Sequence, residues 1–183
     1  MEQKLIIYYF SGTGNSKKVA DWMANEASRQ NHECQTVDIV KTGRISIMSP
    51  DPGALVVFVS PIHGFNYPPV MMNFIARFPK GKNNVVLMNT RAGMLIGKWV
   101  TPGVTGIAFY LSMLLLWLKG YSVKALFPVD MPSNWISVHP GLNTGTVRYI
   151  HEQCITRVTK FAQKVLTGKK HFKALFEFWD MIL

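Results

Sequence analysis

Cysteine is scarce in this sequence, and its scarcity excludes several kinds of site. The 183 residues include two cysteines, Cys34 and Cys154. Two thiols cannot supply a disulfide framework, a four-thiolate zinc site or an iron–sulfur cluster. The opening residues also lack a basic segment followed by a cleavable apolar run, so they predict no secretory signal. We therefore expect a protein of the reducing cytoplasm, whose two cysteines are small buried residues or ordinary thiols.

Acidic residues are also few. Ten Asp and Glu stand against twenty Lys and Arg, which gives a formal net charge of +10, and no acid occurs between Gly53 and Pro128. This balance favours an anionic cofactor, an acidic partner or an anionic surface. The basic residues do not alternate with aromatics along one stripe, so we expect no nucleic-acid partner. No nucleophile–base pair or metal-ligand cluster is recognisable, so no catalytic residue and no metal site is predicted.

Uninterrupted apolar segments are short. The stretch from Gly103 to Leu118 has sixteen residues without a charge, whereas a membrane-spanning helix needs about 20 apolar residues. We interpret it as a buried helix of a globular core. Hydrophobic residues make up 48% of the chain, which is enough to bury such a core and excludes intrinsic disorder.

Five short apolar segments predict β-strands. Their aliphatic and aromatic residues continue on both parities, as in strands that are covered on both faces. The second segment is weaker, so it should lie near an edge. The last contains Pro128, which also suits an edge strand. The segments are Leu5–Phe10, Cys34–Val40, Leu55–Ser60, Val85–Thr90 and Val123–Asp130.

Segments of helical period separate these strands. The first begins after Asn15 or Ser16 as the N-cap. The second begins near Pro68–Pro69 and ends at Phe78. The third is the apolar segment, which ends at Lys119–Gly120, and a fourth carries apolar residues from Val147 to Val165. This alternation predicts a three-layer α/β sandwich: a five-stranded parallel sheet of order 2-1-3-4-5, with helices on both faces.

We assign residues 1–168 to this domain and residues 169–183 to an amphipathic C-terminal tail. In the tail, Phe172, Leu175, Phe176 and Trp179 share one helical face, with lysines nearby. The sequence leaves three interpretations of the tail open: packing on the domain, pairing in a homodimer and contact with an anionic membrane surface.

The loop after the first strand carries the strongest functional signal. In doubly wound sheets, ligands bind beyond the carboxyl ends of the strands. This loop is Ser11-Gly12-Thr13-Gly14-Asn15-Ser16, and a helix follows at once. Backbone N–H groups at a helix N-terminus form an anion site, and the three hydroxyls suit one phosphate. A dinucleotide fingerprint would need glycine where Lys17 stands, and the Walker pattern is absent. A plain glycine turn with a serine cap is the remaining alternative.

The stretch YYFSGTGNS resembles the phosphate loop of flavodoxins. SPIHGFNYPP (residues 60–69) and MPSNW (residues 131–135) are most similar to the flavodoxin halves of bacterial flavodoxin–ferredoxin fusion proteins. The resemblance covers about residues 4–168. No cysteine-rich ferredoxin segment follows, so a role that needs iron–sulfur clusters in the same chain is not carried over. The resemblance implies a flavodoxin-like fold, flavin mononucleotide (FMN) as cofactor, and electron transfer with a reductase or a ferredoxin.

The resemblance also implies where FMN would lie. Its phosphate would bind the loop from Ser11 to Ser16, and its isoalloxazine ring would lie between two further loops. In flavodoxins, a backbone carbonyl of the first ring loop reorients when the flavin is reduced. That loop is the one containing Gly64 here, and Gly64 is our candidate for the residue that reorients. Phe65 and Tyr67 offer ring faces for stacking. Trp135 should cover the sheet edge. The two loops are Pro61-Ile62-His63-Gly64-Phe65-Asn66-Tyr67 and a segment beginning Thr90-Arg91-Ala92-Gly93.

Two functional alternatives stay open from the sequence. One is an NAD(P)H-dependent FMN or quinone oxidoreductase, and the other is a flavin-free interaction module that retains the fold.

The absence of acids around both ring loops, with Arg91 in one of them, further predicts that positive charge raises the reduction potential of a bound flavin.

Overall fold

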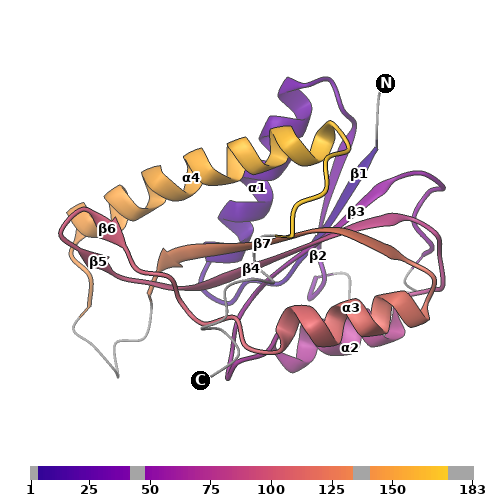
Figure 1. Ribbon diagram of the computed structural model, residues 1–183, viewed down its shortest axis with the longest axis horizontal. Coiled ribbons are helices and arrows are strands. Elements are labelled where there is room, and N and C mark those ends of the chain that lie inside the picture. Colours follow the sequence, from indigo (N-terminus) through magenta and orange to yellow (C-terminus); the bar gives the residue numbers. More distant parts are fainter. Residues whose placement is uncertain (1–3, 42–47, 134–140, 173–183) are drawn as a thin grey trace.

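The computed structural model describes residues 4–41, 48–133 and 141–172. At its centre is a five-stranded parallel sheet whose order is β2-β1-β3-β4-β7 (Figure 1). This order confirms the predicted 2-1-3-4-5 arrangement, with β7 as the fifth strand. The strands are β1 (Leu5–Tyr9), β2 (Cys34–Asp38), β3 (Leu55–Pro61), β4 (Asn84–Gly93) and β7 (Ser122–Pro132).

Within the described residues, four helices cover the sheet and complete the predicted three-layer sandwich. Helices α1 (Asn15–Arg29) and α4 (Thr144–Leu166) lie on one face, and α2 (Pro69–Arg77) and α3 (Ala108–Leu118) lie on the other (Figure 1). Each lies where the sequence predicted a helix. Helix α2 has its N-cap at Pro68 and begins with Pro69, because proline lacks an N–H and suits the first helical position.

Side-chain alternation along the strands divides the core into two layers. On β4, Val86 and Met88 face α1 and α4, where the rings of Phe127 and Phe161 stack with centroids 4.1 Å apart. Residues of opposite parity, such as Leu87, face α2 and α3. The strands are buried on both faces because helices lie above and below them.

The two edge strands are protected in different ways. Strand β2 is short and half-exposed, and it lies at one edge as the weak pattern predicted. Strand β7 forms the other edge and accommodates Pro128. After α4 the chain crosses β7, where His171 N donates to Lys124 O (3.0 Å) and Leu126 N donates to His171 O (2.8 Å). This bridge satisfies backbone groups that an edge strand would otherwise expose.

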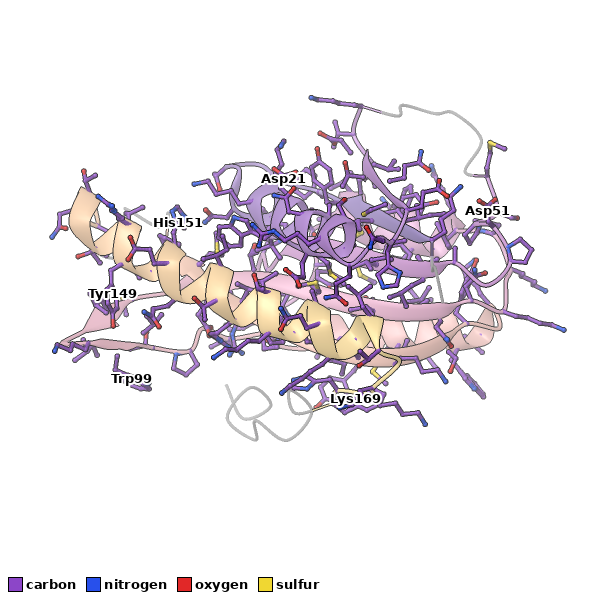
Figure 2. All side chains as sticks on the ribbon, turned by 90° about the horizontal axis from the view of Figure 1, so that it is seen from above. Asp21, Asp51, Trp99, Tyr149, His151 and Lys169 are labelled. Atoms are coloured by element: carbon purple, nitrogen blue, oxygen red, sulfur yellow. The ribbon has the colours of Figure 1, made fainter. Side chains whose placement is uncertain are left out.

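Strands β4 and β7 extend beyond their neighbours. The prediction that β4 ends at Thr90 is wrong, because pairing with β7 continues to Gly93, opposite Pro132. The extension leads into a hairpin that the sequence analysis did not predict, formed by β5 (Leu95–Ile96) and β6 (Trp99–Val100). The first half of α4 reaches the same end of the molecule, where the Tyr149 hydroxyl donates to Lys98 O at 3.1 Å (Figure 2).

The expectation of a fully buried helix is wrong for α3, because one side of this helix is exposed. It begins at Ala108, five residues into the apolar stretch from Gly103, and spans 11 residues. Phe109 and Leu116 are buried, whereas Leu114 is 51% and Trp117 69% exposed. No helix among the described residues is long and apolar enough to cross a membrane. Trp135 and tail residues 173–183 lie outside the described residues, so the predictions made for them stay predictions.

Candidate functional site

The loop from Ser11 to Ser16 leaves the carboxyl end of β1 and turns directly into α1. Gly14 has a left-handed backbone (φ 92°) and is the N-cap, so the predicted caps Asn15 and Ser16 are instead the first helical residues. Glycine is required here because side-chain-bearing residues rarely adopt this conformation. The Ser11 hydroxyl accepts from Gly14 N at 3.0 Å and holds the turn closed.

The outer surface of this loop presents hydrogen-bond donors. No side chain among the described residues caps α1, and its first turn contains no acid. The N–H groups of its first residues have no intrahelical acceptor, and the helix dipole adds partial positive charge there. Apart from the adjacent residues, nothing in the described part of the chain lies within 4 Å of where a Cβ would stand on Gly12 or Gly14. Thr13 is exposed between them. An anion can therefore approach the backbone closely.

Two loop side chains anchor the turn to the sheet. The buried Ser16 hydroxyl lies 2.8 Å from the Thr90 hydroxyl on β4. The Asn15 amide donates to Pro132 O at the end of β7, at 3.1 Å. Ser11 is half-buried and Thr13 is exposed, so both residues are accessible from outside the loop. Ser11 can still donate its own proton, because it accepts from Gly14 N.

The lysines after the loop differ in their environment. Lys17 Nζ forms an ion pair with Asp21 (2.7 Å), which offsets its charge. Lys18 Nζ lies 3.5 Å from His151 Nε2 on α4 (Figure 2). Burial and the Lys18 charge lower the pKa of His151. The lowered pKa favours the neutral imidazole of His151, whose Nε2 can accept from Lys18 Nζ when Nδ1 carries the proton.

The first predicted ring loop is a tight two-residue turn. Ile62 N donates to Thr90 O at 2.9 Å, and His63 and Asn66 exchange backbone hydrogen bonds of 2.8 and 3.2 Å. Gly64 and Phe65 between them have φ values of 55° and 63°. Positive φ at both central positions defines a type I′ turn. Glycine adopts this backbone readily, whereas Phe65 bears strain.

Phe65 is exposed and is fixed by its backbone. Its side chain is 52% exposed, and its carbonyl accepts from Ile107 N at 2.9 Å. Gly106 (φ 63°) makes this approach possible, because a Cβ on it would lie 2.1 Å from Phe65 O. The loop after β3 and the segment before α3 are therefore in direct contact.

Tyr67 does not offer a face to a ligand, and the prediction that it stacks on a ring is wrong. It is 2% exposed, its hydroxyl donates to Met88 O at 3.0 Å, and its ring packs edge-on against Phe109. Burial raises its pKa. Its role is to anchor the start of α2 to β4.

Removing this hydroxyl should affect stability rather than ligand binding. Tyr67→Phe leaves the Met88 carbonyl buried without its donor, which costs about 1–3 kcal/mol. Chemical denaturation should show this loss, and flavin titration should give an unchanged dissociation constant. A variant that keeps its stability but binds flavin more weakly would show that Tyr67 belongs to the ligand site.

The second predicted ring segment is not a loop. Thr90, Arg91, Ala92 and Gly93 belong to β4. Arg91 is buried, and its Nε donates to Asp130 Oδ1 on β7 at 2.6 Å. Its Nη1 donates to the Thr105 hydroxyl at 3.1 Å. The same carboxylate accepts from Gly103 N and from Arg157 Nη1, both at 2.9 Å.

This network changes how the charge of Arg91 is presented at the ring loops. Asp130 offsets that charge inside the protein, although it is shared with Arg157, so two arginines face one carboxylate. The expectation that Arg91 raises a flavin potential stays a prediction. Asp130, Thr105 and Gly106 position the site and were missed. A two-residue Gly97–Lys98 turn between apolar residues could have revealed the adjacent hairpin, but no local pattern marks Asp130 as the partner of Arg91.

Both cysteines are poor nucleophiles. Burial raises the pKa of Cys34 to about 11 and that of Cys154 to about 12. The thiol form therefore predominates at neutral pH, and a thiol reacts far more slowly than a thiolate.

Comparisons with known proteins agree with this geometry. A family model described as a flavodoxin domain matches residues 6–104, more than half of the chain. The crystal structure of oxidised flavodoxin 1 from Bacillus cereus superposes with a TM-score of 0.57 at 15% identity, covering 88% of this chain and 98% of that one.

A second similar structure is Fusobacterium nucleatum flavodoxin bound to flavin mononucleotide, with a TM-score of 0.57 at 13% identity, covering 92% of this chain and 99% of that one. The comparison with curated proteins found no match. At these identities the solved structures support the fold, and the family model supports the membership. The chain belongs to the flavodoxin domain family.

Proposed function

We propose that this protein binds FMN and transfers electrons between redox proteins. The observation that carries the proposal is the loop from Ser11 to Ser16, where donors surround the N-terminus of α1 and its first turn contains no acid. This loop lies in a flavodoxin domain, and a similar solved structure contains FMN.

The phosphate of FMN suits the donors of this loop. The Ser11 and Thr13 hydroxyls and the first N–H groups of α1 would bind it, and Lys18 would add long-range attraction. Asn15 and Ser16 would hold the loop in place through Pro132 and Thr90. A dianion at this position gains charge-assisted hydrogen bonds, which are about twice as strong as neutral ones.

The ring of FMN suits the turn from Pro61 to Asn66. Phe65 provides an exposed aromatic face, and Gly64 leaves open space at the turn. The Gly64–Phe65 peptide can reorient at low cost on the Gly64 side, while Phe65 O stays bonded to Ile107 N. Bound FMN supplies one- and two-electron redox chemistry, and these residues position the ring and limit its contact with water.

The direct test is titration of the purified protein with FMN. Absorbance and quenching of flavin fluorescence should show saturable binding of one FMN. Mixing the complex with NADPH should leave the flavin oxidised until a flavodoxin reductase is added, because we propose a carrier. Rapid reduction by NADPH alone would establish an oxidoreductase instead. A protein that does not bind FMN would refute both.

Thr13→Ala provides a sharper test of the phosphate position. A hydrogen bond to a charged group contributes about 1.5–3 kcal/mol, so affinity for FMN should fall roughly tenfold or more. Affinity for riboflavin, which lacks the phosphate, should stay nearly constant. Equal losses for the two ligands in calorimetry would place the phosphate elsewhere.

A further inference from the structure

Helix α3 carries an exposed apolar surface that the proposed function does not use. Its residues recur at helical spacing along the side that faces away from the core, and we call them the α3 stripe. Scattered apolar residues are normal on a protein surface, but a contiguous stripe indicates an interaction. The α3 stripe consists of Ile107, Tyr110, Leu114, Trp117 and Leu118, which are 58, 42, 51, 69 and 62% exposed.

The described chain ends beside this surface. After α4, which lies on the opposite face of the sheet, the chain crosses the β7 edge and pairs His171 with Ala125. The next residue, Phe172, packs into the core layer beneath α2 and α3. The bridge is parallel to β7, so at Phe172 the chain has reached the α3 side of the sheet and runs in the direction of β7.

The segment that follows Phe172 has the length and pattern to cover the stripe. Residues 173–183 number eleven, which span about 16 Å as a helix and up to about 36 Å when extended. Helix α3 also has 11 residues. In helical spacing, Leu175, Phe176 and Trp179 fall on the face that begins with Phe172. Phe172, the first residue of that face, packs against the core.

The distribution of charge also favours binding of residues 173–183 to α3. The α2–α3 layer contains no acid, because none occurs between Gly53 and Pro128, whereas Arg77, Lys80 and Lys119 lie in it. Residues 173–183 contain Glu177 and Asp180 against the single Lys173. The segment is also tethered at Phe172, so its effective concentration at α3 greatly exceeds that of a free partner.

We propose that residues 173–183 bind the α3 stripe of the same chain through the face of Leu175, Phe176 and Trp179. The segment acts as an intramolecular cover that keeps the apolar side of α3 from water. A second copy of the chain and an anionic membrane are the competing occupants. This proposal does not depend on flavin binding.

Thiol accessibility in the full-length chain tests the cover. Leu114→Cys places a reporter in the stripe, and Ala76→Cys on the exposed side of α2 provides an uncovered reference. The unmodified chain gives the background from Cys34 and Cys154. Because a covered thiol reacts only through local opening, Cys at 114 should react with a water-soluble disulfide reagent roughly tenfold more slowly than Cys at 76.

Two tail variants form a matched pair. Phe176→Asp places a charge on the docking face and should raise the reactivity at position 114 roughly tenfold. Phe178→Asp makes the same chemical change about 160° around a helix from Phe176 and should leave the reactivity nearly unchanged. Neither variant should alter the reactivity at position 76.

Three outcomes would overturn the proposal. Equal reactivity at positions 114 and 76 in the chain with an unmodified tail would show that the stripe is uncovered. Protection that disappears on dilution would indicate a second copy. Protection that appears only with vesicles of phosphatidylglycerol would indicate a membrane. Protection that is independent of concentration and relieved by Phe176→Asp alone supports the intramolecular cover.

Discussion

Asp130→Ala should destabilise the protein by about 3–5 kcal/mol, because it leaves a buried arginine without its counter-charge. Arg91 has a side chain that is 1% exposed, and its Nε lies 2.6 Å from Asp130 Oδ1. Whole domains are stable by about 5–15 kcal/mol, so the loss is a large fraction of the total. Urea denaturation followed by circular dichroism should show a much lower midpoint.

Two controls separate the buried charge from other effects. Asp21→Ala removes the acid of the exposed Lys17–Asp21 pair and should change stability by less than about 1 kcal/mol. Adding Arg91→Met to Asp130→Ala should recover much of the loss, because the unpaired charge is then gone. Equal losses for Asp130→Ala and Asp21→Ala would contradict this account.

Gly106→Ala should disturb the turn that we assign to the flavin ring. The new Cβ would stand 2.1 Å from Phe65 O and 2.5 Å from Phe65 Cβ, so the turn must move and the Ile107 N–Phe65 O bond must lengthen. Left-handed backbone costs about 1–2 kcal/mol, and overpacking adds about 1–3 kcal/mol. We expect a loss of about 3 kcal/mol and at least roughly tenfold weaker flavin binding.

Gly97→Ala is the matched control for this prediction. Gly97 has φ 62° and Gly106 has φ 63°, but no described residue other than its chain neighbours comes within 4 Å of the Cβ position at Gly97. The control therefore bears the backbone cost alone, about 1–2 kcal/mol. Unlike Thr13→Ala, Gly106→Ala should weaken FMN and riboflavin binding equally, because the ring is common to both. A normal affinity for riboflavin would place the ring away from this turn.

The sheet was predictable because its signals are local. Apolar residues on both parities identified the five strands, and Pro128 indicated that β7 lies at an edge. The position of the loop that we propose for the phosphate followed from two glycines between a strand and a helix. Each of these patterns spans fewer than ten residues, so neighbouring side chains are sufficient to produce it.

The errors concern contacts between distant residues. Arg91 can remain buried in β4 because Asp130, 39 positions later, pairs with it. The sequence of β4 alone favours a loop there, since a charge in a strand buried on both faces is costly. Tyr67 is an aromatic residue in a loop that also contains Gly64, and residue type does not determine how deeply a side chain is buried. Its burial depends on Phe109 and Met88, which come from other elements.

The hydrogen bond between Asn15 and Pro132 also determines when the loop can be completed during synthesis. The two residues are 117 positions apart, and at about 5–20 residues per second a ribosome needs on the order of ten seconds to make the intervening chain. Residues 11–16 leave the ribosome well before Pro132, their anchor on β7. Flavin capture on a nascent chain should therefore begin only after β7 has joined the sheet, and it would report completion of the fold.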